Sequence, residues 1–313
     1  MTTLYFDCSM GAAGDMFGAA LLELMPNKKQ ALQYLNSLAI PGVEFQAEQT
    51  KKCGVSGTHL HVLIHGEEEL PPETQTHAER IHEPIYEHAQ EHTHEHTHEH
   101  VCKHEHEHTH EHTHEHTHEH THEHTHEHDH KQTHKHTHEH VHMRLQDVKH
   151  IVEQLSLPPS VRQSIFEVYH IIADAESKAH QCPVEEVHFH EVGAMDAIAD
   201  VTAACALMEQ LHPDEVIISP ICTGTGTVFC AHGELPVPAP ATANILEGMP
   251  FYPGEFSGEL CTPTGAALLK YFAGSYVSSN SKFPIKKDCK AGYGMGTKDF
   301  PRANCLIAYL KEN

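Results

Sequence analysis

The chain has 313 residues, of which 37 are histidines, and its formal net charge is −24. Such acidity argues against binding to nucleic acid or to an anionic membrane. No apolar run approaches the ~20 residues that a membrane-spanning helix needs, and the start of the chain lacks the basic and apolar regions of a secretory signal. Ten cysteines without a CxxC pair fit neither a zinc ribbon nor a dense disulfide framework, so we expect reduced thiols in a cytoplasmic protein.

The N-terminal part predicts a strand, two helices and a β-hairpin. The apolar strand Leu4–Phe6 runs into a glycine-containing turn, and apolar spacing predicts a helix over Met16–Leu24. A second helix is expected over Lys28–Leu38. Val43–Thr50 and Ser56–Ile64 alternate in polarity around a Cys-Gly turn, which is typical of a β-hairpin.

A histidine-rich tract follows the hairpin. Between Gly66 and His142 the chain holds 27 histidines and 19 acidic residues against four Lys or Arg, mostly in a Thr-His-Glu-His repeat. A tract with almost no aliphatic residues cannot build a core, so we expect residues 67–142 to be a disordered insert. The insert divides the folded domain into residues 1–66 and 143–313.

The part after the insert mixes helices and strands without strict βαβ regularity. Helices are expected over Leu145–Leu155, Pro159–Ala179, Ala194–Leu211, Pro240–Leu246 and Thr262–Phe272. Extended segments are expected over Val187–Gly193, Glu215–Ser219, Thr223–Phe229, Phe283–Lys287 and Asn304–Leu310. The fold class is therefore α/β or α+β, with packed helices around a mixed sheet.

The composition of the histidine-rich tract favours metal binding. Neutral imidazole is a good ligand for nickel, copper, zinc and cobalt, and any two or three neighbouring histidines could wrap an ion. Such ions would be weakly held and released as the pH falls through roughly 6.5. The tract therefore predicts metal capture or storage, with a solvated spacer as the alternative. Catalysis needs fixed geometry, so the tract is an accessory.

The segment HFHEVGAMDAIAD predicts an ordered metal site. His188 and His190 share one face of an extended segment, while Asp196 and Asp200 share one face of the following helix. Together with Glu191, a candidate catalytic group, they can converge on one first-row divalent ion. The alternative is that Asp196 caps the helix and His188 forms local hydrogen bonds.

The segment FDCSMGAAGDM is a second candidate. Asp7, Cys8 and Asp15 could ligate a metal or act in catalysis, and Gly11 and Gly14 could let a phosphate-bearing cofactor approach the helix start. The alternative is that the glycines only form a turn and that Cys8 is a core thiol.

Two glycine-rich loops are expected over Gly224–Thr227 and Gly292–Lys298, and both lack the patterns of a phosphate-binding P-loop or a dinucleotide fingerprint. Backbone amides in the second segment could still hold phosphate, with Lys298 adding charge. Thr262, Thr264 and His232 add polar groups near helix starts and are further candidates, the threonines for cofactor binding and His232 for catalysis.

Five segments together resemble one family. They are FDCSMGAAGDM, VHFHEVGAMDAIADV, HGELPVPAPAT, ELCTPTGAALL and GYGMGTKDFPRAN. In this order they closely resemble the LarC family, which inserts nickel into pyridinium-3,5-bisthiocarboxylic acid mononucleotide to form the nickel-pincer cofactor of lactate racemase-type enzymes. A histidine-rich insert at this place is also common in that family.

The resemblance implies a nickel chelatase of the lyase class that uses CTP with Mg(2+) or Mn(2+). It also implies a lactate racemase-type apo-enzyme as the client of the product. Family members usually continue past a strand like Cys305–Leu310 into a domain that carries the CTP site, whereas this sequence stops at Asn313. We therefore expect the C-terminal nucleotide-binding domain to be absent from this chain, either because a separate polypeptide of a split gene supplies it or because it was lost. Alone, the chain is expected to bind nickel without completing turnover.

Two other classes of function remain open. In the first, the protein is a nickel metallochaperone or storage protein in which the tract does the work. In the second, the Asp and His residues form a metal-dependent phosphoesterase. Deletion of the tract separates the insertion enzyme from the storage protein, because only the enzyme retains its activity at ample nickel.

Overall fold

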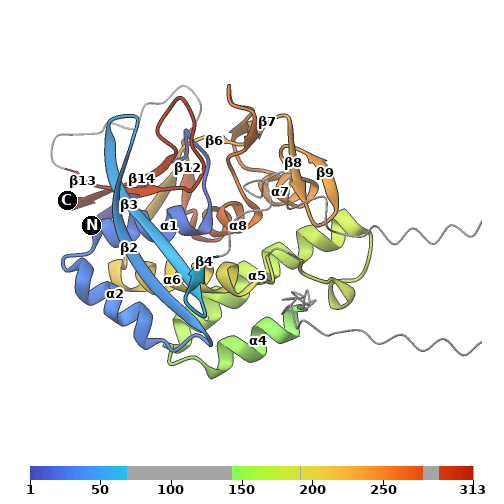
Figure 1. Ribbon diagram of the computed structural model, residues 1–313, viewed down its shortest axis with the longest axis horizontal. Coiled ribbons are helices and arrows are strands. Elements are labelled where there is room, and N and C mark those ends of the chain that lie inside the picture. The colour runs from blue at the N-terminus through green and yellow to red at the C-terminus, as the bar shows by residue number, and fades with distance from the viewer. Residues whose placement is uncertain (69–142, 191, 278–288, 313) are drawn as a thin grey trace, which may run out of the picture. The chain divides into compact units, whose positions relative to one another are not determined.

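The structure is a computed structural model that describes residues 1–68, 143–190, 192–277 and 289–312 (Figure 1). The predicted disordered insert therefore lies outside the described residues, apart from Glu67 and Glu68. All described residues belong to one compact unit. Over the described ranges, no helix has the length and apolar character needed to span a membrane.

An eight-stranded mixed sheet forms the centre of the fold, in the order β12-β5-β1-β14-β13-β3-β2 with β4 beside β3. Its strands are β1 (Thr2–Asp7), β2 (Val43–Lys52), β3 (Val55–Ile64), β4 (Glu67–Glu68), β5 (Glu215–Ile218), β12 (Ser275–Tyr276), β13 (Lys290–Met295) and β14 (Cys305–Glu312). β1, β5 and β12 run parallel, and β14 pairs antiparallel with both β1 and β13. The predicted mixed sheet is confirmed.

Seven α-helices pack around the sheet in the described part of the chain. They are α1 (Gly14–Leu24), α2 (Lys28–Ser37), α4 (Leu145–Gln154), α5 (Pro159–His180), α6 (Met195–Leu211), α7 (Pro240–Leu246) and α8 (Pro263–Phe272). α1 packs against β13, β3 and β14 and also contacts α6, so it lies between the sheet and α6 (Figure 1). Both helices are rich in small residues; a Cβ on Gly18 would lie 3.8 Å from that of Ala203. Small side chains allow this close approach.

The prediction of a loop over Gly292–Lys298 is wrong for its first half, because Lys290–Met295 is strand β13. The glycines serve helix packing here. A Cβ on Gly292 would lie 2.2 Å from the carbonyl oxygen of Ala20, and one on Gly294 would lie 1.9 Å from that of Met16. Any side chain at these positions would push α1 off the sheet.

Short strand pairs lie outside the main sheet. They are β6 (Ile221–Cys222) with β10 (Phe251–Tyr252), β7 (Gly224–Thr225) with β11 (Gly258–Glu259), and β8 (Thr227–Cys230) with β9 (Gly233–Pro236). The strand expected over Thr223–Phe229 is thus divided, because Gly224 and Gly226 have positive φ values and turn the chain. The strand expected over Phe283–Lys287 lies outside the described residues.

The segment expected to be extended over Val187–Gly193 is a loop after a 3-10 turn at Val184–Glu186. Its one link to other backbone in the described part is an antiparallel bridge between Phe189 and Met143. Phe189 is buried against the ring of Tyr169, with ring centroids 5.9 Å apart. This apolar contact anchors the segment without a strand ladder.

Candidate metal centre

Two histidines of β3 point toward one carboxylate. His59 and His61 are two residues apart on the strand, so their side chains leave the same face. His59 is buried, and its Nδ1 donates to the carbonyl oxygen of Met295 at 2.8 Å. In a neutral imidazole this bond leaves the lone pair on Nε2, which is the state that a metal ligand requires.

The turn His65–Gly66 brings Glu68 back against these histidines. Both turn residues have positive φ, as two-residue hairpin turns require, and Glu68 pairs with Leu63. The Glu68 carboxylate then lies 2.9 Å from Nδ1 of His61 and 3.5 Å from Nε2 of His59. Potential ligand atoms of His59, His61 and Glu68 all lie within 4.8 Å of one another. We call this set the β3 cluster.

The hydrogen bonds of His61 favour its protonated form. Burial alone would lower the pKa of His61, but its contacts with Glu68 and with Glu48, at 3.1 Å, outweigh burial and raise that pKa above its ordinary value. Without a metal, the cluster therefore uses a proton on His61 to balance its carboxylates.

Two half-buried carboxylates lie beside the β3 cluster at the start of α1. The Asp15 carboxylate is 3.9 Å from Nδ1 of His59. Asp200, in the second turn of α6, reaches the same helix start, where a Cβ on Gly14 would lie 2.7 Å from its Oδ2. Gly14 therefore lets the Asp200 carboxylate approach the backbone of α1 and accept a hydrogen bond from the backbone of Asp15.

The charge of Asp200 is poorly compensated. Burial raises the pKa of Asp200 well above its usual range, and the nearby Asp15 and Asp196 raise it further. Its Oδ1 is buried and has no hydrogen-bond partner among the described residues. Burial also raises the pKa of Asp15, although the neighbouring His59 opposes that shift. Carboxylates with a buried free oxygen are expected where a cation binds.

The histidines and carboxylates together form a donor set of imidazole nitrogen and carboxylate oxygen. Such a set suits first-row divalent ions, and imidazole ligands place nickel high in the affinity order. No Lys or Arg of the described residues forms an ion pair with Asp15, Glu68 or Asp200. The arrangement defines a candidate binding site for a divalent metal, with half-buried acids at hand to accept a proton.

The predicted ligands lie in three places. Asp196 lies close enough to Asp200 to raise the pKa of Asp200, and Asp200 meets Asp15 as described. His188 instead lies 3.4 Å from the guanidinium of Arg144. His190 belongs to a separate group of exposed histidines with His180 and His232, whose ring centroids are 4.4 to 6.5 Å apart. Ligation by His188 or His190 stays a prediction.

The turn after β1 has mainly packing roles. Cys8 is fully buried, and burial, with smaller effects from Cys261 and Asp7, raises the pKa of its thiol well above the usual value. A protonated thiol is a poor ligand. Asp7 accepts a hydrogen bond from the backbone N–H of Ser9 at 3.0 Å. A Cβ on Gly11 would lie 2.0 Å from a carbonyl oxygen of Leu260, so this glycine is needed where the backbones cross.

The other predicted site residues lie outside the candidate metal centre or outside the described residues. Thr262 caps α8 by accepting from the N–H of Gly265 at 3.2 Å, and its hydroxyl bonds that of Thr264 at 2.9 Å. The carbonyl of Lys298 accepts from Lys52 at 3.0 Å. Glu191 lies outside the described residues. The roles predicted for Thr262, Thr264, Lys298, Glu191 and His232 in binding or catalysis stay predictions.

The sequence analysis missed His59, His61 and Glu68. The signal was present, because His-Leu-His in a hairpin strand has the same spacing as the His-Phe-His that was singled out. Glu68 could not be found this way, since its place depends on the turn at His65–Gly66.

Comparisons with known proteins agree with a metal site. The family description "Nickel insertion protein" matches residues 4–313, and the chain belongs to this family. It is 32% identical over 312 residues to a "Putative nickel insertion protein" of Dictyoglomus thermophilum, covering 100% of this chain and 61% of that protein. It is also 32% identical over 314 residues to a "Pyridinium-3,5-bisthiocarboxylic acid mononucleotide nickel insertion protein" of Geobacillus kaustophilus, covering 100% and 60%.

A protein of that same description from Alkaliphilus metalliredigens is 31% identical over 313 residues, covering 99% of this chain and 60% of its own length. The chain thus spans about three-fifths of the length of these curated relatives. No solved structure matches the chain.

Proposed function

We propose that this protein takes part in the insertion of nickel into pyridinium-3,5-bisthiocarboxylic acid mononucleotide, as the names of its relatives state for them. The observation that carries the proposal is the β3 cluster, His59, His61 and Glu68, next to carboxylates that form no ion pair with a Lys or Arg of the described residues. Nickel is the cargo of this reaction. A site that must release it benefits from few protein ligands, so that the thioacid sulfurs of the acceptor can complete the coordination.

Proton removal is assigned to the half-buried carboxylates. Bonding of nickel to the pyridinium ring requires that a ring carbon lose its proton while the carbon electron pair goes to the metal. Asp200 is suited to accept that proton, because its Oδ1 has no partner and burial holds its pKa well above the usual range. Asp15 lies next to Asp200 and contributes to raising the pKa of Asp200.

The remaining steps follow from the family resemblance. We propose that CTP, with Mg(2+) or Mn(2+), is consumed in the reaction and that this lyase step depends on a region which the relatives contain beyond the matched three-fifths. A lactate racemase-type apo-enzyme would receive the product. A cytoplasmic location agrees with free cysteines at nine positions of the described residues.

Nickel binding to the β3 cluster can be measured without interference from the tract. A variant in which a flexible Gly-Ser linker replaces residues 69–142 keeps Glu68 and removes the histidine-rich repeat. Equilibrium dialysis with nickel should find one tightly bound ion per chain, and the double variant H59Q/H61Q should lose it. H150Q, which changes an exposed histidine of α4, is the matched control. Retention of that ion by H59Q/H61Q would contradict the proposal.

The second candidate is a nickel storage protein, favoured by the 27 histidines between Gly66 and His142. In that case the tract would bind all the functional nickel, and the linker variant would bind no tight ion at all. The same dialysis therefore separates the two functions.

A further inference from the structure

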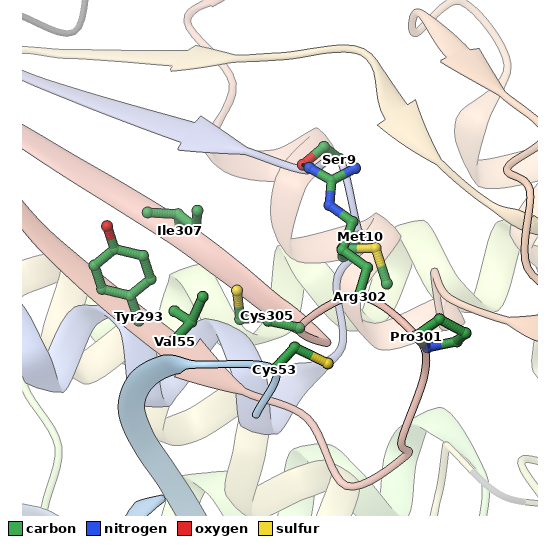
Figure 2. Close-up of a pocket in the computed structure, with 10 residues that line it drawn as sticks. Ser9, Met10, Cys53, Val55, Tyr293, Pro301, Arg302, Cys305 and Ile307 are labelled. Atoms are coloured by element: carbon green, nitrogen blue, oxygen red, sulfur yellow. Dashed lines mark hydrogen bonds between the residues drawn. The ribbon is translucent and has the colours of Figure 1, made fainter. Parts of the chain in front are cut away.

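A pocket of about 360 Å³ lies at the end of the sheet where β1 and β13 finish and β14 begins. Figure 2 shows side chains from four segments around it. Ser9 follows β1, Cys53 lies in the β2–β3 turn, Tyr293 belongs to β13, and Arg302 precedes β14. None of these residues belongs to the β3 cluster.

The pocket opens on the face of the sheet opposite α1. Gly292 and Gly294 meet the backbone of α1, so Tyr293 between them points the other way. Ile307, the register partner of Tyr293, also lines the pocket. Thr58 and Leu60 of β3 contact α1, so His59 and His61 leave the other face of the strand, the same face as Val55, which lines the pocket.

Arg302 gives the pocket its positive charge. Its guanidinium donates to the hydroxyl of Ser9 at 3.0 Å, as Figure 2 shows. Within the described ranges, no carboxylate comes within ion-pairing distance of it. Asp7 lies near enough to influence Cys305, and one of its oxygens accepts a hydrogen bond from the N–H of Ser9. The other donors of the guanidinium remain open to a ligand.

The thiol of Cys305 is a poor metal ligand in this state. Burial, with a smaller effect of Asp7, raises the pKa of Cys305 to about 11, and Arg302 only partly opposes this. A neutral thiol beside one guanidinium favours an anion over a cation. Because the whole chain carries −24, an anion needs such a local cation to bind.

We infer that Arg302, with the Ser9 hydroxyl, binds the phosphate of the mononucleotide whose thioacid groups receive nickel at the β3 cluster. The inference rests on the proposed function. A guanidinium matches phosphate oxygens with two parallel hydrogen bonds, and Ser9 is already placed beside it. Two segments join the pocket to the nickel site: the turn from Ser9 to Asp15, and β3 from Val55 to His59. A nucleotide whose phosphate binds here could extend its pyridinium ring along these two segments toward the nickel site.

The test compares two ligands on the full chain by calorimetry without nickel: the pyridinium bisthiocarboxylate mononucleotide, and the same compound without its phosphate. R302Q should weaken binding of the nucleotide at least about 10-fold, the loss of one charge-assisted contact, and should leave binding of the nucleoside unchanged. R302K keeps the positive charge but not the paired donors of the guanidinium, and it should weaken binding of the nucleotide less than R302Q does. K149Q removes one exposed cation of α4 and should bind both ligands like the wild type.

Equal affinity of R302Q and wild type for the nucleotide would overturn the phosphate site and leave the proposed function standing. A wild-type chain that binds neither compound would overturn the proposed function, and the inference with it. Because Arg302 is exposed, loss of its side chain should leave the melting temperature unchanged, which separates loss of binding from loss of folding.

Discussion

The Asp200 carboxylate has an oxygen without a compensating partner, an arrangement that folded proteins normally avoid. One of its carboxylate oxygens contacts the start of α1, and the other is buried without a hydrogen-bond partner among the described residues. Removing a charged group from water without compensation destabilises the folded state by several kcal/mol unless it is protonated or paired. Burial therefore favours the protonated form of Asp200 in metal-free protein, and a bound cation would favour the ionised form.

Substitution of Asp200 should change how stability depends on pH. The pKa of Asp200 is raised in the folded protein, so between its ordinary value near 3.8 and that raised value the folded state binds more protons than the unfolded state. Stability then falls as the pH rises through this window. D200N should remove the effect, gaining stability over the wild type by about 1 kcal/mol or more between about pH 5 and about pH 8.

Urea unfolding of metal-free protein at the two pH values measures this difference. D174N, which changes an exposed aspartate of α5, serves as the control and should follow the wild type. A parallel pH dependence of D200N and wild type would show that Asp200 ionises freely.

Glu48 should set the pH at which nickel binds. A proton on His61 competes with the metal, and the hydrogen bonds with Glu68 and Glu48 raise the pKa of His61 despite its burial. Nickel affinity should therefore rise as the pH increases through a value above about 6.5. E48Q removes one of the two carboxylates and should move that midpoint to lower pH. Dialysis of the linker variant over a pH series measures it, and E44Q, an exposed position on the same strand, should leave the midpoint in place.

Single residues were partly predictable from sequence. The spacing of Asp196 and Asp200 on one helix face, and the position of Asp15 after a glycine turn, were sufficient to select all three acids. Their histidine partners were assigned to His188 and His190, which shortly precede Asp196 and Asp200 in the sequence. The structure places His59 there because β3 lies beside α1, and such contacts between distant segments are invisible to local spacing.

At the scale of elements, the contact between α1 and β13 holds the candidate site together. α1 carries Asp15 at its start, and its backbone touches the sheet at Gly292 and Gly294. The glycine run was interpreted as a loop because glycine usually weakens strands. The glycines are needed because the backbone of α1 lies in contact with this strand, and that contact depends on tertiary packing.

G294A should strongly destabilise the protein. The added methyl would lie 1.9 Å from the carbonyl oxygen of Met16, and a rigid helix backbone cannot move away without disturbing the core. We expect a loss of at least about 3 kcal/mol, at the upper end for overpacking. G248A is the matched control, since Gly248 has a positive φ but no atom within 4 Å of the added methyl. It should lose only about 1 kcal/mol. Equal losses in thermal unfolding would show that α1 can shift on the sheet.

For the whole molecule, the tract should matter only when nickel is scarce. The ordered cluster is proposed to bind the inserted ion, whereas residues 69–142 supply many exchangeable imidazoles. Replacing these residues by a linker should leave the rate of nickel insertion unchanged at ample nickel. In a chelator buffer at limiting nickel, the rate should fall several-fold. A rate that is lost at every nickel concentration would assign the function to the tract.

Glu68 is the last described residue before the tract, and it is also a proposed ligand of nickel. A nickel ion bound by the tract is therefore already on the same chain as the β3 cluster and need not diffuse through the cell to reach that cluster. Transfer would be a unimolecular event whose rate is governed by the effective concentration that a covalent tether creates. Lengthening the spacer after Glu68 should accordingly slow the transfer of nickel to the β3 cluster, while the equilibrium affinity of that cluster for nickel stays the same.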